Sequence, residues 1–392
     1  MQHAAVPVPR DRLIVPVLGL FLFAIAAGFL MSLLPLSLSG RGLSAELAAW
    51  LASAFYAGLL LGAMRIEPVV RVLGHRRALV AFLSLLAMTV VAMSLWSSAA
   101  LWLGARLVAG AATAGIFVVV ESWLLLVDDE RQRARRLALY MTALYGGNAL
   151  GQILITPVGV AGSLPFALVG LLLVLALLPP LLVRRGAPRL QVHHRLGLRA
   201  VKRLSRPAVL GCWVSGLLLG PLYGLLPLYL IQRPELAGQS GPMMALLIVG
   251  GMGVQPIAGA LSARYSRTLL LALFNLMGML GILVLLLAES VVGIGMALVL
   301  VGAAAFALYP VAIAQACQGQ ANSRIVSITE LMLLCYSLGS VVGPLLAQWS
   351  TGSLTQLPLY LGIVFSATSI YMLVQAAAGT ESAVMEPPAG LD

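Results

Sequence analysis

Long apolar segments of membrane-spanning length occupy most of this 392-residue chain and limit its fold more than any other feature. A helix of roughly 18 to 25 apolar residues crosses the ~30 Å hydrocarbon core of a bilayer. Strands are not expected, because the segments lack strict alternation and an open sheet edge cannot exist in lipid. The sequence therefore predicts an all-α membrane protein with twelve transmembrane helices, at about 13–38, 45–64, 77–96, 101–126, 137–160, 163–183, 208–231, 243–261, 269–288, 291–315, 325–347 and 355–378.

Composition excludes the soluble classes of protein. Hydrophobic residues make up 61% of the chain and charged residues 9%, whereas a soluble globular chain is about 45–50% apolar and about 25% charged. The three cysteines exclude a disulfide-dense scaffold. The first apolar segment is too long for a signal peptide and has no small-residue cleavage site before the next segment.

Basic residues gather in alternate loops, which predicts the orientation of the chain. With the N-terminus in the cytoplasm, 21 of the 24 Lys and Arg residues lie on the cytoplasmic side, as the positive-inside rule requires. The exceptions are Arg41 and Arg233 in outer loops and Arg106 within a helix. The net charge of +11 thus indicates contact with anionic lipid rather than nucleic acid. We expect a bacterial cytoplasmic (inner) membrane protein with both termini cytoplasmic.

The two halves of the chain repeat at an offset of 192 residues. The sequence LLPL at 33–36 recurs at 225–228, and small residues match in the same register, among them Gly28 with Gly220, Gly58 with Gly250, Gly147 with Gly339 and Gly151 with Gly343. We therefore predict an N-terminal six-helix bundle at 1–183, a basic cytoplasmic linker at 184–207 and a C-terminal six-helix bundle with a short tail at 208–392. The linker is either a lipid-headgroup or partner-binding segment or a plain connection that obeys the positive-inside rule.

Several local motifs carry a resemblance to the major facilitator superfamily over nearly the whole chain. The fourth helix opens with RLVAG at 106–110, similar to the family's R-x-x-x-G motif. The connection at 67–77 reads EPVVRVLGHRR and is similar to G-x-x-x-D-R-x-G-R-R, with Glu67 at the first Gly and Arg71 at the Asp. A second copy runs from 259 to 267, with Ala263 at the Asp position.

Three further stretches resemble the YcaD-type transporters of that superfamily. They are VVVES at 118–122, GPLYGLLPLYL at 220–230 and FALYPVA at 306–312. The resemblance implies two pseudo-symmetric six-helix bundles and transport by alternating access around a midplane site. It does not imply a particular substrate.

Arg106, Glu121 and Glu330 are the candidate charged residues inside the membrane, where charges are costly and usually functional. Arg106 and Glu121 lie near one face of the fourth helix, roughly 22 Å apart along its axis. Glu121 is either a proton carrier or an anchor paired with loop arginines such as Arg76. Arg106 lines the central route or snorkels outward. Glu330 near the start of the eleventh helix is a gating residue or compensates the helix dipole.

Polar and aromatic residues on the helices that resemble the family's cavity helices are candidates for the substrate wall, although each could instead make an interhelical hydrogen bond. They are Tyr145, Asn148, Gln152, Tyr223, Gln255, Tyr309, Gln315 and Tyr336. A wall with so few charges favours a neutral, weakly amphipathic or cationic small molecule. In the fifth helix, Gly146, Gly147, Gly151 and Gln152 match part of the family's antiporter pattern, which slightly favours export.

The sequence lacks the residues for other chemistry. All four histidines fall outside the predicted helices, and no Walker motif or catalytic pair is present, so we expect no enzyme activity, no cofactor and no metal. The leading hypothesis is a monomeric secondary transporter that exports a small molecule by proton antiport. Proton-coupled uptake by symport is the second hypothesis. A non-transporting receptor or scaffold is the third, and it would not require Arg106 and Glu121.

The departures from the family motif predict an ion pair of reversed sign at the cytoplasmic gate. Arg71 stands where the family has an Asp that approaches the start of the eleventh helix, and Glu330 could receive its guanidinium. Such a pair would be worth on the order of 1 kcal/mol. In a double-mutant cycle of Arg71→Ala and Glu330→Ala, read out as labelling of the cytoplasmic cavity, we expect non-additive effects. Additive effects would exclude the pair.

Overall fold

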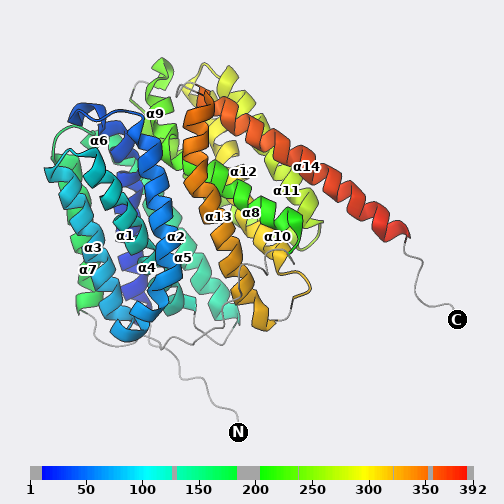
Figure 1. The fold of residues 1–392 in the computed structure, drawn as a ribbon, viewed down its shortest axis with the longest axis horizontal. Helices are drawn as coiled ribbons and strands as arrows, with labels where there is room; N and C mark the ends of the chain where they lie inside the picture. Colours follow the sequence, from blue (N-terminus) through cyan, green and yellow to red (C-terminus); the bar gives the residue numbers. More distant parts are fainter. Residues whose placement is uncertain are drawn as a thin grey trace, which may run out of the picture. The chain divides into compact units, whose positions relative to one another are not determined.

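The computed structural model describes residues 11–125, 130–182, 204–236, 238–320, 322–351 and 356–385, and its regular structure over these ranges is helical (Figure 1). The 3₁₀ segments are η1 (Ser39–Arg41) and η3 (Pro234–Leu236). The α-helices are α1 (Asp11–Ser37), α2 (Leu47–Leu73), α3 (His75–Leu95), α4 (Ala99–Leu125), α5 (Glu130–Ile153), α6 (Ile155–Val158), α7 (Leu164–Leu182), α8 (Arg206–Gly224), α9 (Leu226–Ile231), α10 (Ser240–Ser262), α11 (Arg267–Leu287), α12 (Val291–Ala316), α13 (Asn322–Thr351) and α14 (Leu357–Met385).

All twelve predicted segments are helical, and two of them are interrupted. The seventh divides into α8 and α9 at Leu225, between Pro221 and Pro227, because proline disrupts the backbone hydrogen bonds of a helix. The fifth divides into α5 and α6. Within the described ranges, eleven helices are long and apolar enough to cross a membrane. The predicted fifth span is missing from that set because α5 is rich in charged and polar residues.

Two predicted loops prove to be largely helical. Helix α2 continues to Leu73 rather than ending near 64, so Arg71 lies in its last turn. The connection to α3 is the single residue Gly74, whose φ of 75° favours glycine. Helix α5 begins at Glu130 rather than near 137, and its first turns therefore hold the arginines expected in a loop.

The chain forms two compact units, and each repeats the same packing. The first comprises 1–47 and 57–192, and the second comprises 48–56 and 193–392. In the first unit α1 packs on α5, and α3 packs on α4 and α7. In the second α8 packs on α13, and α11 packs on α12 and α14. The second unit also includes the start of α2, where the Ser53 hydroxyl donates to the Val341 carbonyl at 2.6 Å. Most of the predicted linker, 183–203, lies outside the described residues.

Glycine contacts show that the sequence repeat is also a structural repeat. A Cβ added to Gly147 would collide with the Phe21 carbonyl, and one added to Gly339 would collide with the Trp213 carbonyl. Gly147 and Gly339 are 192 residues apart, and so are their contacts Phe21 and Trp213. The backbones of α1 and α5, and those of α8 and α13, therefore approach closely at equivalent positions, as small residues allow in membrane bundles.

The two basic residues of the predicted outer loops are also equivalent in the repeat, since Arg41 and Arg233 are 192 residues apart. Arg41 donates to the Ser94 carbonyl at 2.8 Å and to Gly162, and it lies over the Phe166 ring. Arg233 donates to the carbonyls of Leu285 and Ala288 at the end of α11 and pairs with Glu235 at 3.2 Å. Each guanidinium thus caps the C-terminus of the third long helix of its bundle, where cations are favourable.

A hydrogen bond from its own backbone N–H, followed by that from Arg233, lowers the pKa of the half-buried Glu235 carboxyl. Burial lowers the pKa of Arg233, but its hydrogen bonds to Tyr229 and Glu235 outweigh burial and raise that pKa overall. Both groups therefore remain charged at physiological pH.

The close α1–α5 contact predicts different effects for two neighbouring glycines of α5. A Cβ at Gly151 would lie 2.6 Å from the Phe29 nitrogen, whereas one at Gly146 would meet nothing within 4 Å. We expect Gly151→Ala to destabilise the protein by about 1–3 kcal/mol through overpacking, measured as a lower midpoint of thermal unfolding in detergent. Gly146→Ala is the matched control and should be neutral or slightly stabilising. Equal midpoints for the two variants would contradict the close contact.

Candidate functional site

A carboxylate and a phenol meet between α4 and α5 in the first unit. The Tyr140 hydroxyl donates to Glu121 Oε1 at 2.8 Å. Tyr140 is buried, with an exposed fraction of 3%, whereas the Glu121 side chain is accessible. Within the described part of the chain Glu121 has no ion pair. Its partner is therefore a neutral donor.

The residues beside Glu121 are held in a separate network. His75 is buried, and its Nε2 lies 2.9 Å from Ser122 Oγ. Because the Ser122 hydroxyl donates to the Val118 carbonyl at 2.6 Å, it accepts from His75, which assigns the ring proton to Nε2. The His75 ring also meets Trp123 edge to face. This network fixes the rotation of α4 against α3 at the level of Glu121.

Arg76 does not form the ion pair with Glu121 that was one of the two interpretations of the sequence. Its guanidinium donates to the backbone carbonyls of Pro180 and Leu181 at the end of α7. Arginine in this position caps the orphan carbonyls of a helix C-terminus. Glu121 is therefore free of this cation.

Three of the substrate-wall candidates lie on α5. Gln152 is fully buried, and its amide accepts from the Ser32 hydroxyl at 2.6 Å and donates to the Gly28 carbonyl at 2.8 Å. It therefore joins α5 to α1. Asn148 is half-buried and donates to the Leu144 carbonyl one turn earlier. Tyr145 is half-buried in the same helix.

The candidates of the second unit form two groups. Tyr223 packs edge to face on Phe306, and the Gln255 amide donates to the Phe306 carbonyl at 3.3 Å. The Tyr309 and Tyr336 rings lie with centroids 5.1 Å apart.

Gln315 lies apart from both groups. Its amide donates to the Thr268 hydroxyl at 2.7 Å, at the end where α11 begins. Gln315 therefore joins α12 to α11 rather than extending the aromatic groups.

The remaining charged candidates lie on separate helices. Arg106 is half-buried in α4, with its Nε atom enclosed. Arg71 is exposed in the last turn of α2 in the first unit, and Glu330 is exposed on α13 in the second. Because α13 begins at Asn322, Glu330 lies more than two turns into the helix, where the terminal dipole is weak. The pairing of Arg71 with Glu330 stays a prediction.

The sequence patterns did not identify two residues that the structure places at candidate sites, Tyr140 and Arg267. Tyr140 follows Glu121 by 19 residues, across a helix connection, and only its place in an unusually polar helix marked it. Arg267 was counted among the loop arginines, but it begins α11, and its Nε and Nη1 atoms are buried.

Comparisons with known proteins agree with the family resemblance predicted from the sequence. A family model described as Major Facilitator Superfamily matches residues 17–344. An uncharacterized MFS-type transporter of Enterobacter sp. (strain 638) is 33% identical over 363 residues, covering 91% of this chain and 93% of that protein. The uncharacterized MFS-type transporter YcaD of Shigella flexneri is 33% identical over 361 residues, with the same coverage.

Solved structures share the fold at low sequence identity. The peptide transporter POT in complex with sulfate has a TM-score of 0.79 at 14% identity, covering 97% of this chain and 96% of that one. The nucleoside transporter NupG has a TM-score of 0.76 at 10% identity, covering 94% of this chain and 99% of that one. These likenesses bear on the fold alone.

The contacts of Gln152 predict that it contributes mainly to stability. Gln152→Leu removes the partner of two buried groups on α1, and we expect it to destabilise the protein by about 1–3 kcal/mol. Asn148→Leu loses only a bond within its own helix and is the matched control, with a smaller effect. Thermal unfolding of both variants in detergent measures the difference. A Gln152→Leu protein as stable as Asn148→Leu would show that the α1 contacts are unimportant.

Proposed function

The chain belongs to the Major Facilitator Superfamily and is a multi-pass membrane transporter, and we propose that it couples transport of a small organic molecule to proton movement through Glu121. In this proposal the protein lies in the bacterial cytoplasmic membrane with both termini in the cytoplasm. Substrate and proton bind as the protein alternates between its inward and outward states.

The contact between Glu121 and Tyr140 carries this proposal. A carboxylate that touches a cation is held in its charged form, whereas a phenol can serve both forms. The Tyr140 hydroxyl donates to the charged carboxylate, and its oxygen can accept from the protonated one. Glu121 is also exposed in the first unit, and in this proposal protons reach it from that side. Both protonation states are therefore supported by the same neighbour.

We assign export by antiport as the direction. The support is the glycine pattern of α5, in which Gly147 and Gly151 pack against the α1 backbone and form a tight helix contact. Such a contact suits an exporter that must prevent leak of its own coupling ion. In antiport, the proton that binds Glu121 on one face is released on the other, and substrate travels in the opposite direction.

The substrate class follows from the wall candidates. Tyr309 and Tyr336 present a paired aromatic surface, and Tyr223 and Gln255 add aromatic and amide groups around Phe306. These groups suit flat, neutral or cationic molecules, because aromatic faces attract cations and stack on apolar rings. We propose small organic molecules of that class, carried by a monomer.

A transport assay tests the function as a whole. The purified chain in proteoliposomes, with an imposed pH gradient, would be screened with neutral and cationic organic compounds. Substrate movement in the direction opposite to proton flow supports antiport. Movement in the same direction as protons would show symport and overturn the assignment of export. Equal rates with and without a gradient would overturn proton coupling.

Substitutions at the carboxylate and the phenol should separate coupling from binding. Glu121→Gln is expected to abolish gradient-driven transport but to retain substrate exchange, because it keeps the shape of the side chain and removes its proton. Tyr140→Phe should slow coupled transport by about tenfold, since it removes one hydrogen bond to a charged group. Tyr265→Phe, at an exposed position outside the long helices, is the matched control. Loss of exchange together with net transport in Glu121→Gln would instead indicate an anchoring role.

A further inference from the structure

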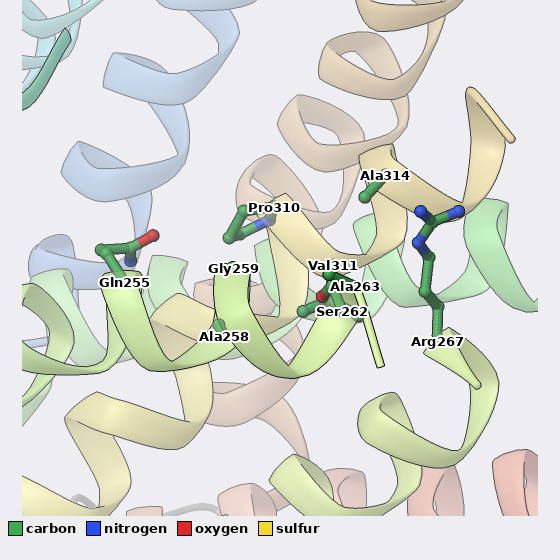
Figure 2. Close-up of a pocket in the computed structure, with 9 residues that line it drawn as sticks. All are labelled: Gln255, Ala258, Gly259, Ser262, Ala263, Arg267, Pro310, Val311 and Ala314. Atoms are coloured by element: carbon green, nitrogen blue, oxygen red, sulfur yellow. The ribbon is translucent and has the colours of Figure 1, made fainter. Parts of the chain in front are cut away.

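A cavity of about 300 Å³ lies within the second unit, between α10, α11 and α12 (Figure 2). Most of its lining is small or apolar, namely Ala258, Gly259, Ser262, Ala263, Pro310, Val311 and Ala314. Gln255 lies at one end of the lining and Arg267 at the other, with the guanidinium beside the turn of α12 that carries Ala314 (Figure 2). The cavity thus has an apolar middle and one cationic end.

The three helices that line the cavity, α10, α11 and α12, contain no Asp or Glu. The Nε and Nη1 atoms of Arg267 are buried and make no hydrogen bond to the described residues. From Leu236 to Ala288 and throughout α12 the chain contains no Asp or Glu. Burial of these two nitrogens without a partner among the described residues is costly, because they lose water and gain no countercharge. A countercharge supplied from outside the chain would relieve that cost.

We propose that this cavity is a binding site for the oxyanion of an amphiphilic molecule, a phosphodiester or carboxylate, held by Arg267 with its apolar part along the small residues. Arginine presents a planar fork of donors that matches such groups. The Ser262 hydroxyl lies on the same lining and adds a polar contact. This site is separate from Glu121, which belongs to the first unit.

The size and place of the cavity agree with a headgroup rather than a large ligand. Its volume lies at the lower end of the range for ligand pockets. The positive-inside pattern predicts that this end of the unit faces the cytoplasm, where anionic lipids concentrate and basic pockets between helices bind their headgroups. The oxyanion has two possible sources, an anionic phospholipid of that leaflet or a water-soluble amphiphilic anion.

Binding can be measured as thermal stabilisation of the full-length chain in a neutral maltoside detergent. The probes are dihexanoylphosphatidylglycerol, the zwitterionic dihexanoylphosphatidylcholine, and hexanoate. We expect the unfolding midpoint to rise with the phosphatidylglycerol probe and not with phosphatidylcholine. A rise with hexanoate as well indicates that a water-soluble anion suffices, whereas a rise with the phospholipid alone identifies a lipid headgroup.

Two matched pairs of variants locate the effect. Arg267→Gln should weaken the response by about tenfold in probe concentration, whereas Arg264→Gln, at an exposed position three residues earlier, should leave it unchanged. Gly259→Leu adds a side chain to the cavity lining while Arg267 is kept, and its Cβ meets nothing within 4 Å. It should abolish the response. Gly253→Leu is its control, since it has the same open surroundings on α10 but lies outside the cavity lining.

The proposal is overturned if neither anionic probe stabilises the wild-type chain. It is also overturned if Arg267→Gln and Gly259→Leu respond like their controls. Gly259→Leu keeps the test decisive where Arg267→Gln folds poorly, because leucine favours helix more than glycine does. None of these outcomes depends on proton coupling, so failure here is distinguishable from failure of the transport mechanism.

Discussion

The backbones of α1 and α5 approach each other at Gly147 and Gly151, and those of α8 and α13 do so at Gly339 and Gly343. In lipid, helices gain little from the hydrophobic effect, and close packing with internal hydrogen bonds replaces it. The first of these contacts allows a helix as polar as α5 to sit inside a bundle. Gln152 then satisfies its amide against α1, and Tyr140 is buried where it reaches Glu121. Helix α5 therefore carries both the close contact with α1 and the phenol of the candidate site.

The two units keep the same framework but differ in chemistry. Both have glycine contacts at equivalent positions, and both have an arginine that caps the third long helix of the bundle. The first unit adds a carboxylate with a neutral donor, which suits proton exchange. The second adds aromatic groups and a cavity with one cationic end, which suits organic molecules and anions. The two halves thus share a common framework on which each carries its own polar residues.

Much of the fold could be predicted from sequence, because apolar residues mark the membrane-spanning segments and small residues mark the 192-residue repeat. Helix ends were predicted less well. Arginines at 131–136 suggested a loop, yet α5 includes them, since a helix can extend beyond the membrane. The interaction partners could not be predicted. Helix rotation decides whether Gln152 faces a substrate or Gly28, and whether Glu121 contacts Arg76 or Tyr140. Short polar patterns in the sequence do not determine this rotation.

The central claim is that Glu121 gains and loses a proton next to a neutral partner. Infrared difference spectroscopy of the protein in lipid, recorded between acidic and alkaline pH, detects the C=O stretch of a protonated carboxyl group directly. We predict a pH-dependent carboxyl band that is absent from the spectrum of Glu121→Gln. In Tyr140→Phe the band should shift in frequency, because the Glu121 carboxyl no longer has a hydrogen bond to the Tyr140 hydroxyl. A Glu121→Gln spectrum identical to that of the wild type would contradict the account.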